Sequence, residues 1–402
     1  LHSFPTRRSS DLSAQDVVLA VNAGSSTLKF GFYGRDPAQT VFSGSIEGLE
    51  PGGTPTLRCA GQPTQPVAVG QDGPFAAALR HLSTVFQGQA SQSRLRAVAH
   101  RIVHGGDRYT SSVLVNADVL AHLQQYEPLA PLHQPHNLAG VRALQQAFPG
   151  LPQVACFDTA FHAGMPAVER RFALPPHADL QGVQRYGFHG LSYQYLATRL
   201  AQRSPAAAGR CVLAHLGNGA SLCATRGGRS VATSMGFSAL DGLMMGTRSG
   251  SIDAGVLLHL LKRGWNAQQL EDLLYRQSGL KGVSGLSADM RVLRDSSSPA
   301  ARDAVALFTY RVLRECGAMT ALLGGIDLLA FTGGIGENDP ALRQRVCEDL
   351  AYLGVQLDAE ANRGAGTTTI RPIHAPGSRV EVWVVPTDEG RVAAEQAWAL
   401  IG

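Results

Sequence analysis

The chain has 402 residues, which corresponds to two or three domains of about 150 residues, each large enough to bury its own core. Hydrophobic residues make up 44% and charged residues only 16%, a composition that argues against a disordered chain or a coiled coil. The net charge is +4 without a basic block, and no window approaches about 18 uninterrupted apolar residues. We therefore expect neither a nucleic-acid partner nor a membrane-spanning helix.

The six cysteines are scattered along the chain and form no C-x-x-C pair. This spacing argues against a disulfide framework or a thiolate zinc site, and it favours the reducing cytoplasm. Residues 1–14 lack the apolar run of a signal peptide and do not blend into the sequence that follows. We expect them to be a non-native segment, with the native start near Gln15.

The first half of the chain opens with a predicted hairpin, in which two apolar runs flank a Gly/Ser turn. The strands expected in this half are residues 17–22, 28–33, 41–46, 95–103 and 154–157. The helices expected from apolar spacing are residues 75–86, 117–125 and 136–148. Residues 50–74 are rich in Gly, Pro and Gln and predict a loop.

The second half begins again with two strands around a Gly-rich turn. Its expected strands are residues 211–216, 220–225, 326–331 and 381–385. Its expected helices are residues 254–262, 267–277, 300–323, 389–400 and one that starts near Pro340. Strands that alternate with helices predict α/β layers.

The two hairpins resemble each other at a constant offset of 194 residues, where Val18-Leu19-Ala20 matches Val212-Leu213-Ala214. Chance similarity between two hairpins would explain this. The other explanation is two copies of one domain, each presenting a Gly-rich turn to the same ligand across a cleft.

Three Gly-rich turns are candidates for phosphate binding, because exposed backbone N–H groups approach phosphate oxygens closely. They are residues 22–27, which precede Lys29, then 215–219, and 332–338 between a strand and a helix. Each could equally be an ordinary turn. Neither a P-loop nor a Rossmann fingerprint is present, and the histidines lack the H-E-x-x-H spacing of a zinc protease. No G-x-S-x-G elbow supports a hydrolase.

Taken together, nine motifs resemble those of the acetate kinase family, with propionate kinase a close relative. From about residue 17 to the C-terminus they read VNAGSSTLKF, HRIVHGG, LAPLHQPHN, FDTAFH, RYGFHG, HLGNGASL, GLMMGTRSG, FTGGIGEN and VVPTDEG. The resemblance implies two duplicated ribonuclease H-like (actin-like ATPase) domains, as in sugar kinases and Hsp70, with mixed sheets flanked by helices and a central nucleotide cleft. It implies domains at 15–160 plus 390–402, and at 161–389 with the adenosine site. It also implies a homodimer.

The resemblance also assigns roles by position. Asn22 and Glu389 are expected to place Mg²⁺ (or Mn²⁺), largely through water. Arg101 and Arg248 are expected to hold acetate, with Val103, Leu132 and Ala239 beside its methyl group. His189 and Arg248 would stabilise the phosphoryl group, with Asp158 and His133 as further catalytic residues. The expected ATP or ADP contacts are Lys29, His215, Leu216, Gly217, Asn218, Gly219, Asp289, Met290, Arg291, Gly333, Gly334, Ile335, Gly336, Glu337 and Asn338.

The chemistry of the reaction qualifies one of these roles. Phosphoryl transfer spreads negative charge over three oxygens, which two arginines, a histidine and Mg²⁺ can neutralise. Acetate is already an anion at pH 7, so it needs no base. We therefore expect Asp158 to orient Arg101, Arg248 or the waters of the metal, and not to carry a proton.

The chain departs from the family at four positions. Leu191 and Tyr193 replace the usual Thr and His, Gly390 replaces a second Glu, and Ala239 stands where Pro is common. The leading expectation is reversible transfer from ATP to acetate, with some use of propionate. The alternatives are a propionate or other short-chain acyl kinase, a nucleotide-driven binding protein, and a family member with weakened catalysis.

Overall fold

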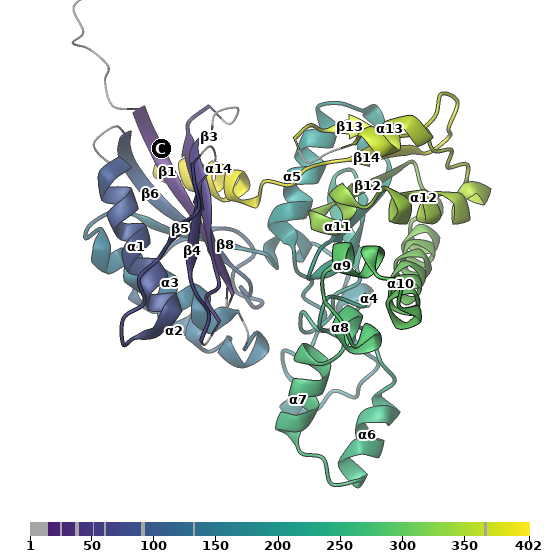
Figure 1. Cartoon of the computed structure of the whole chain (residues 1–402), viewed down its shortest axis with the longest axis horizontal. Helices are drawn as coiled ribbons and strands as arrows, with labels where there is room; N and C mark the ends of the chain where they lie inside the picture. The colour runs from purple at the N-terminus through teal and green to yellow at the C-terminus, as the bar shows by residue number, and fades with distance from the viewer. Residues whose placement is uncertain are drawn as a thin grey trace, which may run out of the picture.

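The computed structural model describes residues 15–24, 26–36, 40–50, 52–59, 62–89, 93–131, 133–365 and 368–402. The expected non-native segment, residues 1–14, and the predicted substrate residue Leu132 lie outside the described residues. Two sheets, each flanked by helices, stand side by side (Figure 1). Within the described ranges, every helix is too short or too polar to cross a membrane.

The first sheet has eight strands in the order β5-β4-β3-β2-β1-β6-β8-β7. Their bounds are β1 Gln15–Ala23, β2 Thr27–Gly34, β3 Thr40–Glu47, β4 Thr56–Cys59, β5 Gln65–Pro66, β6 Ser93–Ile102, β7 Val113–Leu114 and β8 Gln153–Phe157. The first three strands are antiparallel, and β6 and β8 run parallel to β1.

The second sheet has six strands in the order β11-β10-β9-β12-β14-β13. Their bounds are β9 Arg210–Leu216, β10 Ala220–Arg226, β11 Arg229–Thr233, β12 Leu328–Thr332, β13 Arg371–Pro372 and β14 Glu381–Val384. Here too an antiparallel unit, β9 to β11, is followed by β12 and β14, which run parallel to β9. The shared strand order and directions confirm the predicted duplication.

The two hairpins are equivalent in their strand pairing, but no single offset along the sequence relates both of their strands. Val18 and Val212 are 194 residues apart, whereas their cross-strand partners, Tyr33 and Ala224, are 191 apart. Between these equivalent pairs, the second hairpin is therefore three residues shorter than the first. The offset of 194 holds for β1 and β9 but not for the strands that pair with them.

Helices cover both faces of each sheet. Their bounds are α1 Gly73–Gln89, α2 Ala117–Gln124, α3 Gln134–Ala147, α4 Ala167–Arg170, α5 Gly190–Ala201, α6 Ala254–Lys262, α7 Ala267–Arg276, α8 Gly279–Ser284, α9 Met290–Asp295, α10 Pro299–Leu323, α11 Gly333–Asn338, α12 Pro340–Asp349, α13 Ala359–Gly364 and α14 Glu389–Ile401. Short 3-10 helices are η1 Glu127–Leu129, η2 Ala160–His162, η3 Ala178–Leu180, η4 Pro205–Ala208 and η5 Ala351–Leu353.

Successive side chains of a strand point to opposite faces of its sheet, so neighbouring residues pack against different helices. On β1, Val17, Leu19 and Val21 pack in one cluster with α1 and α3, whereas Val18 and Ala20 pack with α14. On β9, Val212 and Ala214 pack with α10, and Leu213 packs with α5. The C-terminal helix α14 therefore returns to the first sheet, where Figure 1 shows it beside β1.

Most predicted elements are present, within a few residues of their expected bounds. The expected loop 50–74 is wrong in part, since β4 and β5 extend the sheet there by pairing at its edge. The strands β7, β11 and β13 and the helices α4, α5, α8, α9, α11 and α13 were not predicted, and α11 forms where a Gly-rich turn was expected at residues 332–338. Among them, β11, α5 and α8 each begin at or next to a glycine, which interrupts the periodic pattern of apolar residues.

Candidate active site

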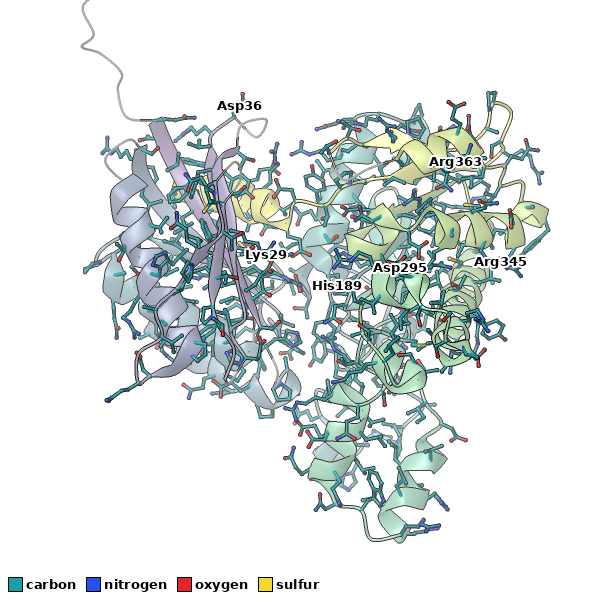
Figure 2. The ribbon with its side chains drawn as sticks, in the orientation of Figure 1. Lys29, Asp36, His189, Asp295, Arg345 and Arg363 are labelled. Carbon is teal, nitrogen blue, oxygen red and sulfur yellow. The ribbon has the colours of Figure 1, made fainter. Side chains whose placement is uncertain are left out.

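A cavity of ≈ 1840 Å³ is lined by residues of both sheets. From the first sheet come Asn22, Lys29 and Arg101, and from the second come the turn after β9 and the start of α11. Figure 2 shows Lys29 and His189 on facing sides of the space between the sheets. The lining residues follow the carboxyl ends of the parallel strands, the usual place for a ligand in an α/β sheet.

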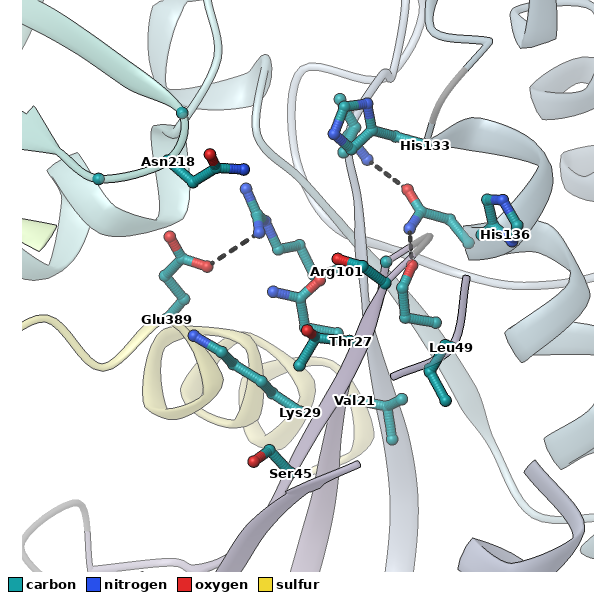
Figure 3. A pocket seen from close by; sticks show the side chains of 18 of the residues that line it. Val21, Thr27, Lys29, Ser45, Leu49, Arg101, His133, His136, Asn218 and Glu389 are labelled. Atoms are coloured by element: carbon teal, nitrogen blue, oxygen red, sulfur yellow. Dashed lines mark hydrogen bonds and ion pairs between the residues drawn. The ribbon is translucent and has the colours of Figure 1, made fainter. Parts of the chain in front are cut away.

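Arg101 is held between two carboxylates, Asp158 and Glu389, in the lining of this cavity. Figure 3 shows its contact with Glu389. Its Nη2 donates to Asp158 Oδ2 at 2.6 Å, and its Nε lies 3.1 Å from both Asp158 oxygens. Its Nη1 lies 3.2 Å from Glu389 Oε2. Although burial lowers the pKa of Arg101, the two adjacent anions outweigh it, and the net pKa is raised. Arg101 is therefore a firmly charged and fixed cation.

The two carboxylates respond to this arrangement differently. Burial raises the pKa of Asp158, and the guanidinium of Arg101 opposes that rise. Burial acts on Glu389 in the same sense, but the charges of Arg101, His215 and Lys29 together lower its pKa. Glu389 thus stays ionised while it faces the cavity.

Arg248 lines the same cavity from the second half of the chain. Its Nη1 donates to the carbonyl oxygen of Ala239 at 2.8 Å, and its Nη2 lies 3.5 Å from His133 Nε2. Burial, Arg248 and Arg101 together lower the pKa of His133 to about 3. A neutral His133 therefore lies within the field of both guanidinium groups, as expected if all three face one anion.

His189 is held in an unusual backbone conformation at the start of α5. Its φ of 59° makes it the one non-glycine residue with positive φ among those described. Its Nδ1 lies 2.8 Å from Ser221 Oγ, and its ring stacks on His215 with centroids 4.2 Å apart. Burial, followed by His215 and the nearby arginines, lowers its pKa well below the ordinary value. Strain of this kind accumulates at functional sites.

Two Gly-rich turns meet on the side of the second sheet. A Cβ on Gly333 (φ +79°) would lie 2.7 Å from the carbonyl oxygen of Leu216, and one on Gly217 would lie 3.7 Å from Gly334 N. Glycine is therefore required at position 333, whereas the separation at Gly217 is an ordinary contact distance. The buried Glu337 carboxylate accepts bonds from Gly333 N at 2.9 Å and Thr387 N at 3.2 Å, which ties the turn to the loop before α14.

Some predicted nucleotide residues do not line the cavity; these are Leu216, Asp289, Met290, Arg291, Ile335, Gly336 and Asn338. Asp289 caps α9 through Arg291 N and pairs with the exposed Arg291 side chain. Met290 is buried in the core. Apart from Leu132, which lies outside the described residues, the structure thus brings together the predicted phosphate, metal and substrate residues, but not these seven.

The apolar end of the cavity includes Val103, Pro131, Phe188 and Ala239. Val103 is buried, and its backbone N–H donates to Asn137 Oδ1 at 2.9 Å. This fixes the backbone of Val103 at the lining of the cavity that Arg101 also lines. Such a small apolar pocket suits the methyl group of a short carboxylic acid.

The structure shows which residues surround two of the positions that depart from the family motifs, Leu191 and Gly390. Leu191 is buried with Val392 and Ala394 of α14. A Cβ on Gly390 would lie 2.5 Å from Tyr33 Oη, and Tyr33 donates to Asp388 Oδ1 at 2.8 Å. Tyr33 therefore occupies the space that a side chain at position 390 would need.

Sequence reasoning missed several polar partners of the site. Ser221 bonds His189, Ser192 Oγ lies 2.8 Å from His215 Nδ1, and Tyr193 bonds Ser221. Ser221 and Ser192 lie in or beside quoted motifs, which was the available signal. Their bonding partners depend on how the start of α5 packs against β9 and β10, which a single sequence does not give.

The sequence matches the Acetokinase family over residues 17–395. It is 47% identical to an acetate kinase of Rhodopseudomonas palustris (strain ATCC BAA-98 / CGA009), with 96% of this chain and 98% of that protein covered. The structure resembles a crystal structure of Porphyromonas gingivalis acetate kinase (TM-score 0.85, 35% identity, 96% and 100% covered). It equally resembles a propionate kinase from Francisella tularensis subsp. tularensis SCHU S4 (TM-score 0.85, 33% identity, 95% and 98% covered). The chain therefore belongs to the acetokinase family.

Proposed function

We propose that this protein is an acetate kinase, which transfers the terminal phosphoryl group of ATP to acetate and gives acetyl phosphate and ADP reversibly. The observation that carries this proposal is the convergence of Arg101 and Arg248 on one cavity with the neutral His133. Two guanidinium groups beside a small apolar pocket suit a short carboxylate. A nucleotide-driven binding protein would need the glycine turns but not this pair.

The nucleotide would lie along the facing turns, with its phosphates near Gly217, Gly219, Gly333 and Gly334. Backbone N–H groups and the charge of Lys29 would bind the phosphate oxygens. Asp289, Met290, Arg291, Ile335, Gly336 and Asn338 do not line the cavity itself, and we propose the exposed side chains among them, Arg291 and Asn338, for the adenosine end. This places the adenosine site in residues 161–389, with 15–160 and 390–402 forming the other domain.

The residues present also fit a magnesium ion. Asn22 offers an amide oxygen and Glu389 a carboxylate, and both line the cavity. Mg²⁺ prefers such hard oxygen ligands, and it retains waters and phosphate oxygens in the remaining positions. When bound, it would neutralise charge on the transferred phosphate. Mn²⁺ accepts the same ligands.

In the proposed mechanism, the acetate oxygen attacks the terminal phosphorus directly and in line. Arg101 and Arg248 hold the carboxylate, and Arg248 with His189 stabilises the phosphoryl oxygens. Acetate needs no base, so Asp158 fixes the guanidinium of Arg101 and takes no proton. Neutral His189 and His133 offer N–H donors without adding charge.

A propionate kinase is the second candidate, because Ala239 is small and a solved propionate kinase is equally similar in structure. An assay that traps acyl phosphate as the hydroxamate separates the candidates. We expect a strong signal with acetate and a weaker one with propionate. A stronger propionate signal would reassign the substrate, a trace with both would indicate weakened catalysis, and ATP hydrolysis without acyl phosphate would favour a binding protein.

A further inference from the structure

Tyr193 is not among the residues that line the cavity, but it is linked through Ser221 to His189, which lines it. It lies on α5 and its side chain is fully buried, with an exposed fraction of 0%. Its hydroxyl is hydrogen-bonded to Ser221 Oγ, which lies 2.8 Å from His189 Nδ1. Tyr193, Ser221 and His189 therefore form a continuous chain of hydrogen bonds from the core to the cavity.

The direction of this chain follows from the number of protons available. Burial raises the pKa of Tyr193 well above its ordinary value, so the phenol keeps its proton. Ser221 Oγ is the side-chain acceptor in contact with that proton. The single proton of Ser221 is then left to bond His189 Nδ1. In the reverse direction the buried tyrosine proton would lose its bond to Ser221, which is unfavourable.

The direction of these hydrogen bonds decides which tautomer of the His189 imidazole is present. His189 is neutral because burial and the neighbouring cations lower its pKa. If Nδ1 accepts from Ser221, the ring proton must be on Nε2. A Cβ built on Gly219 would lie 3.3 Å from His189 Nε2 and 4.0 Å from Arg248 Nη1, so Nε2 faces the glycine turn beside Arg248.

We propose that Tyr193 is a positioning residue, which acts through Ser221 to hold His189 as the Nε2–H tautomer with that N–H directed into the cavity. Its catalytic consequence rests on the proposed function, because this N–H would bond the transferred phosphoryl group. A donor fixed in advance stabilises a developing charge without reorganisation. The usual family residue at this position is His, so this arrangement is specific to Tyr193.

Tyr193→Phe tests the hydroxyl without disturbing the packing. The ring contacts Phe161 and His162 with centroids 6.2 and 5.7 Å apart, and phenylalanine preserves both contacts. Without the tyrosine proton, Ser221 is free either to donate to His189 Nδ1 or to accept from it. The tautomer should then become mixed.

The tautomer can be read from the ¹⁵N resonances of His189 in histidine-labelled protein, assigned with His189→Asn. We expect Nε2–H in the wild type and a raised Nδ1–H fraction in Tyr193→Phe and in Ser221→Ala. Removal of one preorganised donor costs about 100-fold or more in kcat. A partial shift should therefore lower kcat by about tenfold, with the KM for ATP and acetate within about twofold.

Tyr195→Phe is the matched control, since it makes the same change two residues later on α5, and it should alter neither the spectrum nor kcat. An Nδ1–H tautomer in the wild type would overturn the proposal. So would a tautomer in Tyr193→Phe identical to that of the wild type, whether or not kcat falls, or an unchanged kcat when the tautomer shifts. The spectrum needs no turnover, so absence of kinase activity would contradict the proposed function while the tautomer is still measured.

Discussion

Both carboxylate oxygens of Asp158 bond the guanidinium of Arg101, with the shortest contact 2.6 Å from Nη2 to Oδ2. A bidentate pair of this kind fixes the plane of the guanidinium as well as its position. Its remaining nitrogen, Nη1, points to Glu389. The pair therefore prepares Arg101 for an anion in the cavity.

Asp158→Asn should lower kcat by about ten- to a hundredfold, because Arg101 loses its orientation while the chemistry still needs no base. The dependence of kcat on pH should keep its shape. Steady-state rates across about pH 6 to 9 check this. If the variant loses a basic limb that the wild type has, Asp158 carries a proton and the positioning role is wrong.

Arg248→Lys should lower kcat/KM for acetate by about 100-fold or more, because lysine cannot bond both Ala239 and an anion with a planar fork. Arg345→Lys makes the same change in an exposed pair with Asp349 and should leave the rate unaltered. Initial rates with acetate check both variants. Similar rates for the two would remove Arg248 from the site.

Val103→Ala should shift preference toward propionate, since it removes two methyl groups from the apolar end of the cavity. One methylene in a pocket is worth about 1–3 kcal/mol of discrimination, so the ratio of kcat/KM for propionate to acetate should rise about tenfold. The wild type should prefer acetate but use propionate. No change in the ratio would place the acyl group elsewhere.

Gly333→Ala should destabilise the fold by about 1–3 kcal/mol, because the residue has φ +79° and a Cβ would collide with Leu216 O. Gly334→Ala is the matched comparison, since no atom lies within 4 Å of its Cβ. Its stability should change by less than about 0.5 kcal/mol. Urea unfolding measures both. Equal losses would mean that the turn is not constrained as described.

Stability should fall as the pH drops below about 6.5, the ordinary pKa of histidine. His100, His104 and His162 are buried, and burial lowers the pKa of each to about 4. The unfolded chain therefore binds more protons than the native protein, so the free energy of unfolding rises with pH in this window. Each histidine contributes about 1 kcal/mol per pH unit. Urea midpoints between about pH 5 and 7 check this; a flat profile would contradict the burial of neutral histidines.

The sequence predicted the hairpins, the strand alternation and most helices, because apolar period and Gly-rich turns are local signals. It also predicted that Arg101, Arg248 and His189 gather with the glycine turns, through the resemblance of their motifs. It did not predict the strands β4 and β5 or the contact of Tyr193 with Ser221. The two strands depend on which segments pair at the edge of the sheet, and the contact depends on how α5 packs against β10. Neither is local information.

A double-mutant cycle on Arg101 and Arg248 tests the central claim most directly, with kcat/KM for acetate measured in Arg101→Ala, Arg248→Ala and the double variant. Residues that hold one anion act as a unit, so the double variant should lose much less than the product of the two single losses. Losses that combine independently, within about 0.5 kcal/mol, would show that the two guanidinium groups do not serve the same substrate.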